Sequence, residues 1–220
     1  MTKNDAPRDA GAKKGAAADE REIEVRLRGS AGASDDSDEL ARRFAEMAAA
    51  SGDAEVAFAT VDTPVGTTSV AATSRGIVSV GLPNHALDDF VERLASDISP
   101  RIVEAPGRLD DARRELSEFF EGERREFGLE LDWALVPGGF YRKVLNATAR
   151  LPYGSTKTYG EIAKSAGNPR AHRAAGTALG VNPLPIVVPC HRIVRAGPDP
   201  GNYGGGPELK RWLLELEGSL

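Results

Sequence analysis

The strongest constraint on the fold is a change in the pattern of apolar residues at Pro137-Gly138-Gly139. Before this point, residues 56–82 form three short β-branched runs that are separated by turn sequences at 63–66 and 74–76. Such runs predict short strands. After it, apolar residues recur at helical spacing. Because Pro and Gly interrupt both kinds of segment, the tripeptide predicts a boundary between a sheet-containing part and a mostly helical part.

The part before the boundary, residues 53–135, is expected to form a small antiparallel sheet with helices near 86–98 and 109–121. An extended piece over 127–136, FGLELDWALV, is expected to close this half. No candidate site is evident in this part. Its alternation of strand and helix patterns places the chain among α/β (α+β) proteins.

The N-terminal segment, residues 1–52, is expected to be a largely disordered tail. Its first 36 residues hold too few large apolar side chains to offset the entropy lost on ordering. The alternating stretch REIEVRLR at 21–28 could still form an extended piece. A short helix is expected at 38–50, because Asp36-x-x-Glu39 resembles a capping box.

The C-terminal part, residues 136–220, carries clear helix boundaries. A helix is expected over Phe140–Ala149, and Thr158-x-x-Glu161 is a capping box that opens a helix ending at Gly167. Asn168 is expected to cap the next helix, with Pro169 at its first position and Gly180 at its end. Two short helices joined by so tight a turn predict a helix-turn-helix.

The second of these helices has two different faces. Small residues on one face allow close packing, whereas Arg173, Gly176 and Thr177 share another face. Small residues beside one Arg suit a helix pressed into a DNA groove, although an Ala-rich helix packed on its own domain has the same pattern. The candidate DNA contacts are therefore Arg173, Ala171, Ala174, Gly176 and Thr177.

Charge is distributed unevenly along the chain, whose net charge is −5. Residues 136–220 carry 11 Lys and Arg against 5 Asp and Glu, whereas 53–135 carry 8 against 17 and 1–52 carry 9 against 11. A positive C-terminal part suggests a polyanionic partner, although chance could produce the same imbalance. Nucleic acid is favoured over a membrane surface, because no basic amphipathic helix accompanies the charge.

Several features exclude other classes of protein. No apolar run approaches the ~20 residues that span a bilayer, and the first residues lack the apolar core of a secretory signal. The sequence contains one cysteine, which can form no internal disulfide and favours a reducing compartment. A cytoplasmic protein without a multi-cysteine zinc site is therefore expected, and no metal site is predicted.

That single cysteine lies in Pro189-Cys190-His191-Arg192, after the apolar, strand-like run Ile186-Val187-Val188. A neighbouring imidazole and guanidinium are expected to lower the pKa of the thiol and to favour the reactive thiolate. A lone cysteine is more often a buried, inert residue. The Cys-His pair by itself leaves both interpretations open.

The wider sequence around Cys190 resembles the O6-alkylguanine-DNA alkyltransferase family. Pro-Cys-His-Arg follows Asn182-Pro-x-Pro and precedes Gly201-Asn202-Tyr203 and a Lys-x-Trp-Leu-Leu segment. The resemblance is continuous over about 140–218 and weaker over 56–135. It implies a ribonuclease H-like domain at 53–135 and a winged helix-turn-helix domain at 136–220. It also implies self-alkylation without a cofactor, in which an alkyl group moves irreversibly from O6 of guanine in DNA to Cys190.

The resemblance further implies a role for individual residues. His191 would remove the thiol proton through a bound water, and Glu217 would orient that histidine. Asn182 would brace the active-site turn. Arg173 would enter the duplex where the flipped guanine had been. Tyr159 would hydrogen-bond the flipped base and help to protonate it, and the base pocket would be formed by Tyr203, Gly204 and Ile193, with backbone groups of Cys190 among those that read the guanine edge.

Each role has a simpler structural alternative. Arg173 could contact only phosphates, Tyr159 could pack at the start of a helix, and Asn182 could be a turn residue before proline. Glu217 ends a helix with an apolar stripe, where a carboxylate opposes the helix dipole. This unfavourable placement hints at a function, but glutamates at the surface of helix ends are common.

The sequence also departs from the family pattern, and other functions fit parts of it. Gly204 replaces a residue that is often Ser in the family, so one side-chain contact to the guanine would be missing. A non-catalytic sensor that binds alkylated bases and recruits other repair factors is the main alternative, although such proteins lack the acceptor cysteine. A helix-turn-helix regulator would explain the basic part but not Pro-Cys-His-Arg. The expected partner is duplex DNA containing O6-alkylguanine, bound by a monomer.

Overall fold

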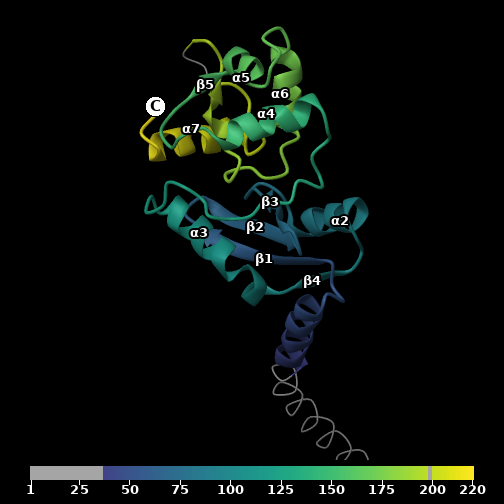
Figure 1. Ribbon diagram of the computed structural model, residues 1–220. Helices are drawn as coiled ribbons and strands as arrows, with labels where there is room; N and C mark the ends of the chain where they lie inside the picture. The colour runs from purple at the N-terminus through teal and green to yellow at the C-terminus, as the bar shows by residue number, and fades with distance from the viewer. Residues whose placement is uncertain (1–36, 198–199) are drawn as a thin grey trace, which may run out of the picture. The chain divides into compact units, whose positions relative to one another are not determined.

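The computed structural model describes residues 37–197 and 200–220 of the chain, drawn in Figure 1. The chain divides into two units, residues 1–44 and residues 45–220, and the second is compact. The expectations for residues 1–36 lie outside the described residues. The chain is helical over 37–51, a range that includes the helix expected at 38–50. All elements discussed below belong to the second unit.

The sheet has four strands, whose ranges are given at the end of this paragraph, in the order β3-β2-β1-β4, where the numbers follow the sequence. The turn sequences at 63–66 and 74–76 join antiparallel strands, as predicted. The expectation of a purely antiparallel sheet is wrong, because β4 pairs with β1 in parallel. This three-residue strand is too short to produce an alternating pattern in the sequence. The strands are β1 (Val56–Thr63), β2 (Gly66–Thr73), β3 (Gly76–Gly81) and β4 (Ile102–Glu104).

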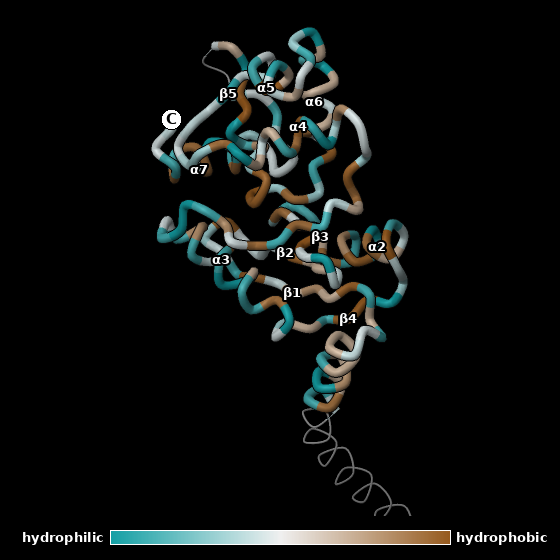
Figure 2. The backbone as a smooth tube through the Cα atoms, in the orientation of Figure 1, coloured by the Kyte–Doolittle hydropathy of each residue, from teal (hydrophilic) through white to brown (hydrophobic). Residues whose placement is uncertain are grey.

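Two amphipathic helices pack on the sheet. Helix α2 (Leu87–Asp97) buries Phe90 and Leu94 against the sheet, and a short 3-10 helix, η1 (Pro106–Leu109), leads into α3 (Asp110–Phe120). Both helices match the ranges expected from the sequence. Figure 2 shows that apolar residues follow the strands, whereas hydrophilic residues occupy the outward turns of α3. Burial of the apolar helix faces therefore fixes the two helices on the sheet.

The segment 127–136, expected as an extended piece, pairs with the sheet at one residue only. Leu131 forms a single isolated bridge to Ile77, and the backbone of Ile77 exchanges two hydrogen bonds of 2.8 Å with Glu130 and Asp132. The side chain of Asp132 then accepts a hydrogen bond from the backbone of Ala134, which turns the chain away from the sheet. The segment consequently covers part of the outer edge of β3 without extending the sheet.

The C-terminal part begins with α4 (Phe140–Ala149), the range predicted from the sequence. The capping box at Thr158 and Glu161 is present and opens α5 (Tyr159–Ser165). Helix α6 (His172–Gly180) starts later than predicted, because Asn168 accepts a hydrogen bond from Arg170 in a turn and caps no helix. Strand β5 (Lys157–Thr158) pairs with β6 (Ile193–Val194), and α7 (Gly206–Leu216) follows.

The apolar run Ile186-Val187-Val188 is also not a strand. It lies in a buried turn in which the Val188 N–H donates to Leu184 O at 2.7 Å. Ile186 has a φ of 73°, which is the left-handed conformation that β-branched residues rarely adopt. Burial of the three side chains holds this strained turn in place, directly before the residues of the candidate site.

The expected fold class agrees with this arrangement, a small sheet domain followed by a helical part. The precise division at residues 135 and 136 stays a prediction, because residues 45–220 group as one compact unit. Within the described ranges, no helix has the length and apolar character required to cross a membrane.

Candidate active site

Cys190 begins a short 3-10 helix, η2 (Cys190–Arg192), at the end of the strained turn. Its side chain is buried, with 9% of the residue surface exposed. Asn182 joins both ends of the turn: its Nδ2 donates to Val188 O at 2.9 Å and to Cys190 Sγ at 3.2 Å. Its Oδ1 accepts a hydrogen bond from the Leu184 N–H at 3.1 Å. Asn182 therefore fixes the position of the thiol as well as the turn.

His191, Arg192 and Glu217 form a buried network beside the thiol. Nε2 of His191 lies 2.9 Å from Oε1 of Glu217, and the Arg192 guanidinium binds the same carboxylate, with Nε 2.9 Å from Oε2. The Gly154 N–H also donates to Oε2 at 3.2 Å. The unfavourable position of Glu217 at the end of α7 is therefore explained by these partners, and the carboxylate does not lie on the surface.

The charges of this network determine which histidine nitrogen carries the proton. The hydrogen bonds of His191 and Arg192 lower the pKa of Glu217 to about 2, despite the opposing effect of burial. Burial lowers the pKa of His191, so its imidazole is neutral near pH 7. Because an ionised carboxylate only accepts hydrogen bonds, Nε2 must be the donor. The other ring nitrogen, Nδ1, then has a lone pair and, among the described residues, no hydrogen-bond partner.

The expectation that neighbouring cations lower the pKa of Cys190 is wrong. Burial raises this pKa, and it outweighs the Asn182 hydrogen bond and the charge of Lys210, which act in the opposite direction. The Arg192 guanidinium is instead bound to the Glu217 carboxylate. The resting residue is consequently a thiol, and a reaction at Cys190 requires a group that removes its proton.

Cys190 lines a cavity of about 370 Å³. Asn182, Tyr203 and Gly204 line the same cavity, as do residues of β3 and α2. The Tyr203 hydroxyl is buried and has no hydrogen-bond partner within the described part of the chain. The structure thus brings together the Cys190 thiol, the Asn182 side chain that binds it and two of the residues predicted for the base pocket.

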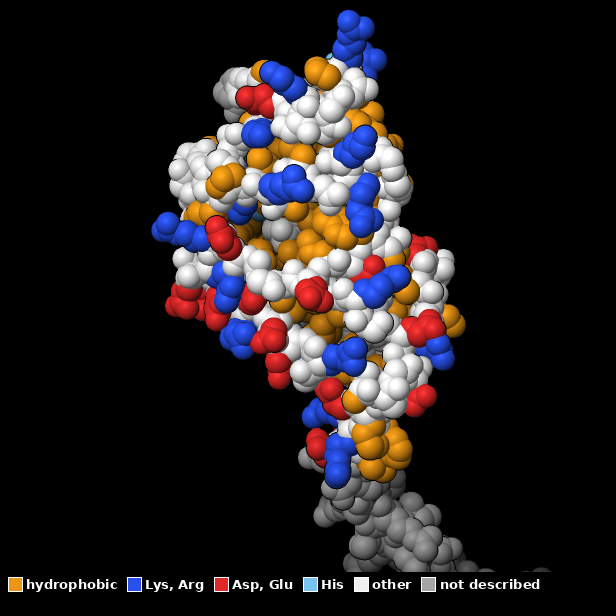
Figure 3. Space-filling model, in the orientation of Figure 1, with side chains coloured by type: hydrophobic (Ala, Val, Ile, Leu, Met, Phe, Trp, Pro, Cys, Tyr) orange, Lys and Arg blue, Asp and Glu red, His pale blue; other side chains and the backbone are white. Residues whose placement is uncertain are grey.

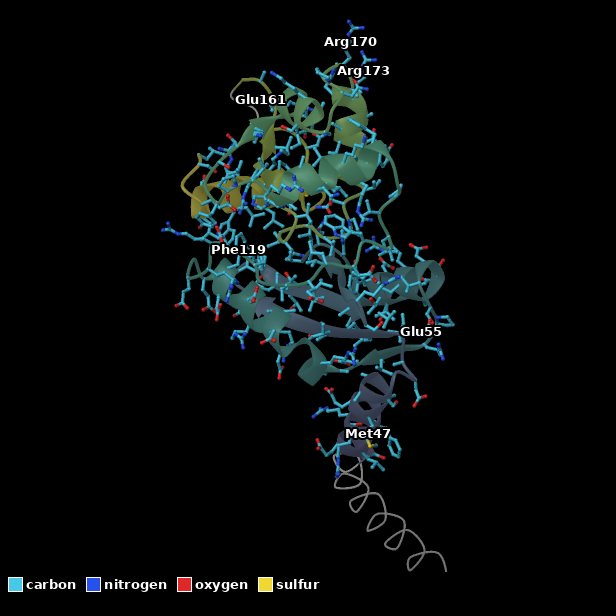
Figure 4. The ribbon with its side chains drawn as sticks, in the orientation of Figure 1. Met47, Glu55, Phe119, Glu161, Arg170 and Arg173 are labelled. Atoms are coloured by element: carbon cyan, nitrogen blue, oxygen red, sulfur yellow. The ribbon has the colours of Figure 1, made fainter. Side chains whose placement is uncertain are left out.

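Tyr159 and Arg173 lie in a different, more open hollow, together with Gly176, Arg195 and Asn202. A Cβ on Gly201 would lie 3.4 Å from the Tyr159 hydroxyl. The Tyr159 hydroxyl therefore lies next to Gly201, two residues before Tyr203. Figure 4 shows Arg173, with Arg170, at the outer end of the helical part, pointing away from the protein. The structure therefore does not place Tyr159 in the Cys190 cavity.

The faces of α6 agree with the pattern in the sequence. Ala175, Ala178 and Leu179 are buried against the rest of the protein, and Arg173 and Thr177 are exposed. Figure 3 shows that Lys and Arg side chains predominate over the helical part on this face of the molecule, whereas Asp and Glu gather over the sheet part. This distribution follows the charge imbalance along the sequence.

The sequence analysis missed Lys210 and the structural use of Arg192. Lys210 is completely buried in α7, and its Nζ donates to Ile193 O at 2.6 Å and to Asn202 O at 3.3 Å. It therefore fixes Ile193 and also Asn202, the residue directly before Tyr203. The spacing could have revealed it, because Lys210 lies three residues before buried Leu213 and seven before Glu217, on one helix face.

Comparison with known proteins gives two matches that together cover most of the chain. Residues 56–133 match the ribonuclease-like domain of 6-O-methylguanine DNA methyltransferase, and 139–219 match its DNA binding domain. A methylated-DNA–protein-cysteine methyltransferase of Mycobacterium tuberculosis is 40% identical over 162 residues, covering 74% of this chain and 92% of that protein. An inducible one from Bacillus subtilis is 36% identical over 149 residues, covering 67% and 82%.

Solved structures show the same similarity. The crystal structure of Mycobacterium tuberculosis O6-methylguanine methyltransferase superposes with a TM-score of 0.64 at 36% identity, covering 74% of this chain and 93% of that one. The structure of Mycobacterium tuberculosis OGT in complex with DNA gives the same values.

Proposed function

Because the chain belongs to the 6-O-methylguanine DNA methyltransferase family and repairs DNA by alkyl transfer to a cysteine, we propose that Cys190 is the acceptor. The observation that carries this assignment is the buried Cys190 thiol, braced by Asn182 and followed directly by the His191–Glu217 pair. It is also the only cysteine in the sequence.

The proposed reaction begins with removal of the thiol proton. Nδ1 of His191 accepts it through a bridging water, and the Glu217 carboxylate stabilises the imidazolium that forms. Cys190 Sγ then attacks the alkyl carbon, forming an S–C bond while the C–O6 bond breaks. The electron pair of that bond stays on guanine, which takes up a proton to become neutral. The thioether is stable, so each molecule reacts once.

The remaining site residues are proposed to bind the base. Backbone groups of Cys190 and Gly204, in the cavity walled by Tyr203, would read the guanine edge together with those of Ile193, which is not among the residues that line the cavity. Lys210 supports this assignment, because it fixes Ile193 O. Tyr159 is proposed to help protonate the leaving guanine, which requires the base to extend from the cavity towards the hollow that holds its ring.

The proposed partner is duplex DNA with O6-alkylguanine, and O4-alkylthymine is a second candidate substrate. The exposed face of α6, with Arg173, Ala174, Gly176, Thr177 and the preceding Ala171, is proposed to enter the minor groove. Phosphate contacts would make the affinity depend on salt and little on sequence. We propose that the protein acts as a monomer in the cytoplasm, where the acceptor thiol stays reduced.

The intact mass of the protein tests this function directly. After incubation with duplex DNA containing one O6-methylguanine, the protein is expected to gain one methyl group, on the peptide that holds Cys190, and to saturate at one per molecule. Tight binding to the same duplex without a mass gain would instead establish the non-catalytic sensor.

Replacement of Arg173 tests whether this side chain enters the duplex where the flipped guanine had been, or only contacts phosphates. The Arg173→Ala variant is expected to lose at least about tenfold in the rate on duplex O6-methylguanine, because the side chain no longer offsets the cost of unstacking the base. Its reaction with free O6-benzylguanine, which needs no base flipping, should be unchanged. The rates are measured by intact mass.

The matched control is Arg170→Ala, since Arg170 is also exposed at the outer end of the helical part (Figure 4). This control is expected to keep the ratio of the duplex rate to the free-base rate. An equal loss of rate on both substrates in Arg173→Ala would contradict the proposal that Arg173 enters the duplex in place of the flipped guanine.

A further inference from the structure

The cavity at Cys190 is formed by residues from both parts of the second unit. Its lining includes Leu82 and His85 from the connection between β3 and α2, and Phe90 from α2 itself. From the C-terminal part it includes Cys190 and Gly204. The sheet part of the chain therefore contributes directly to the surroundings of the acceptor thiol, although the sequence analysis found no site in it.

Two contacts connect the β3–α2 turn, residues 82–86, to residues 203–205, which are called the base-pocket segment below. Asn84 Nδ2 donates to Gly204 O at 3.1 Å. Leu82, only 3% exposed, packs on the same segment: a Cβ added to Gly204 would lie 3.9 Å from Leu82 Cδ1, and one added to Gly205 would lie 3.1 Å from it. The turn thus holds the backbone of this segment by one polar and one apolar contact.

A further contact fixes the turn relative to the thiol. The Val80 N–H donates to Pro183 O at 2.8 Å, and Pro183 follows Asn182, which binds Cys190 Sγ. The end of β3 is therefore held to the turn that leads from Asn182 to Cys190, as well as to the base-pocket segment. Because the turn that leads to Cys190 and the segment around Gly204 are both anchored to residues 80–84, the geometry of the cavity depends on that stretch.

We propose that the β3–α2 turn, through Leu82 and Asn84, is a wall of the alkyl-binding cavity and sets the size of the alkyl group that Cys190 accepts. This inference rests on the proposed function of Cys190. Leu82 would contact the alkyl group itself, together with Phe90, so an apolar alkyl group larger than methyl is the class of substrate that this wall selects. Asn84 is a positioning residue, because it acts through the Gly204 backbone.

The test compares two alkyl groups in the same duplex, one O6-methylguanine and one O6-benzylguanine, so that DNA binding is held constant. Leu82→Phe fills part of the cavity and is expected to lower the ratio of the benzyl rate to the methyl rate by at least about tenfold, since even one methylene in a pocket changes discrimination on this scale. Both rates are measured by intact mass.

A second variant covers the case in which the Leu82→Phe substitution prevents folding. Gly204 has a φ outside the left-handed region and an exposed position, so Gly204→Val is expected to fold and to lower the same ratio by adding a branched side chain beside Leu82 in the cavity lining. Asn84→Ala removes the hydrogen bond that fixes the wall and is expected to raise the ratio by about fivefold, the effect of one typical hydrogen bond. Asn84→Gln, which keeps the amide donor, should restore most of the original ratio.

The matched control is Glu92→Ala, at an exposed position of α2 outside the cavity lining, which is expected to leave both rates unchanged. A wild-type protein that gains no alkyl group from either duplex would contradict the proposed function itself. Transfer of both groups by the wild type, with an unchanged ratio in the folded Leu82 or Gly204 variant, would overturn the inference about the wall alone.

Discussion

Replacement of Cys190 by alanine is expected to abolish alkyl transfer and to leave DNA binding intact. The residue supplies the only thiol in the sequence, and no other group in the proposed reaction can form the thioether. Its side chain packs in a buried turn that Asn182 also fixes through Val188 O and Leu184 N, so the fold should persist without the sulfur. Intact mass after incubation with O6-methylguanine duplex, together with a binding titration of that duplex, measures both effects.

The expected outcome is no mass gain, with an affinity within about threefold of the wild type, since DNA binding is attributed mainly to phosphate contacts and the α6 face. The melting temperature serves as the control for folding. A methyl group found on any other residue of the Cys190→Ala variant would show that the acceptor has been assigned wrongly.

Replacement of Glu217 by glutamine is expected to cause a larger loss of stability than any other substitution proposed here. The buried carboxylate neutralises the Arg192 guanidinium and accepts from His191 Nε2, with its own side chain fully buried. Removal of one partner from a buried ion pair leaves an uncompensated charge and costs about 3 kcal/mol or more. For a chain of this size, such a loss lowers the melting temperature by about 6 °C or more. Thermal unfolding of the variant measures it.

Acid provides an independent check on the same carboxylate. Because the folded pKa of Glu217 is lowered from 4.5 to about 2, its contribution to the free energy of unfolding is complete above pH 4.5 and is lost as the pH falls to 2. The loss amounts to about 3 kcal/mol over this range. The difference in stability between the wild type and Glu217→Gln should shrink accordingly.

The matched control is Glu215→Gln, on the exposed side of the same helix. It is expected to unfold like the wild type at every pH, since an exposed charge contributes little. A Glu217→Gln variant that is as stable as this control would show that the buried network does not stabilise the fold.

Local signals in the sequence predicted most helices but failed where the chain depends on distant partners. The capping box at Thr158 and Glu161 is satisfied within four residues, and α5 begins where it indicates. Strand β4 was missed, because it is defined only by its pairing with β1. The run Ile186–Val188 reads as a strand, yet burial holds Ile186 at a positive φ in a turn. Tertiary packing overrides β-propensity there.

The same distinction applies to the candidate site. Cys190 and His191 could be named as candidates because they lie within the ordered motifs that carry the family resemblance, whereas the adjacent pair alone left both interpretations open. Glu217 was indicated by the family resemblance and by its unfavourable position at a helix end, but the guanidinium that neutralises it is visible only in three dimensions. The direction of the Cys190 pKa was predicted wrongly, because no sequence pattern reports how deeply a thiol is buried.

The covered edge of β3 has a consequence for how the protein associates. An open strand edge is a template for pairing with other chains and leads to aggregation. The Ile77 backbone is paired with Glu130 and Asp132, and the Val80 N–H is bound to Pro183 O, so the contacts that shape the active site also block this edge. The opposite edge strand, β4, is only three residues long. Both edges of the sheet are thereby protected from strand-to-strand association with a second copy of the chain.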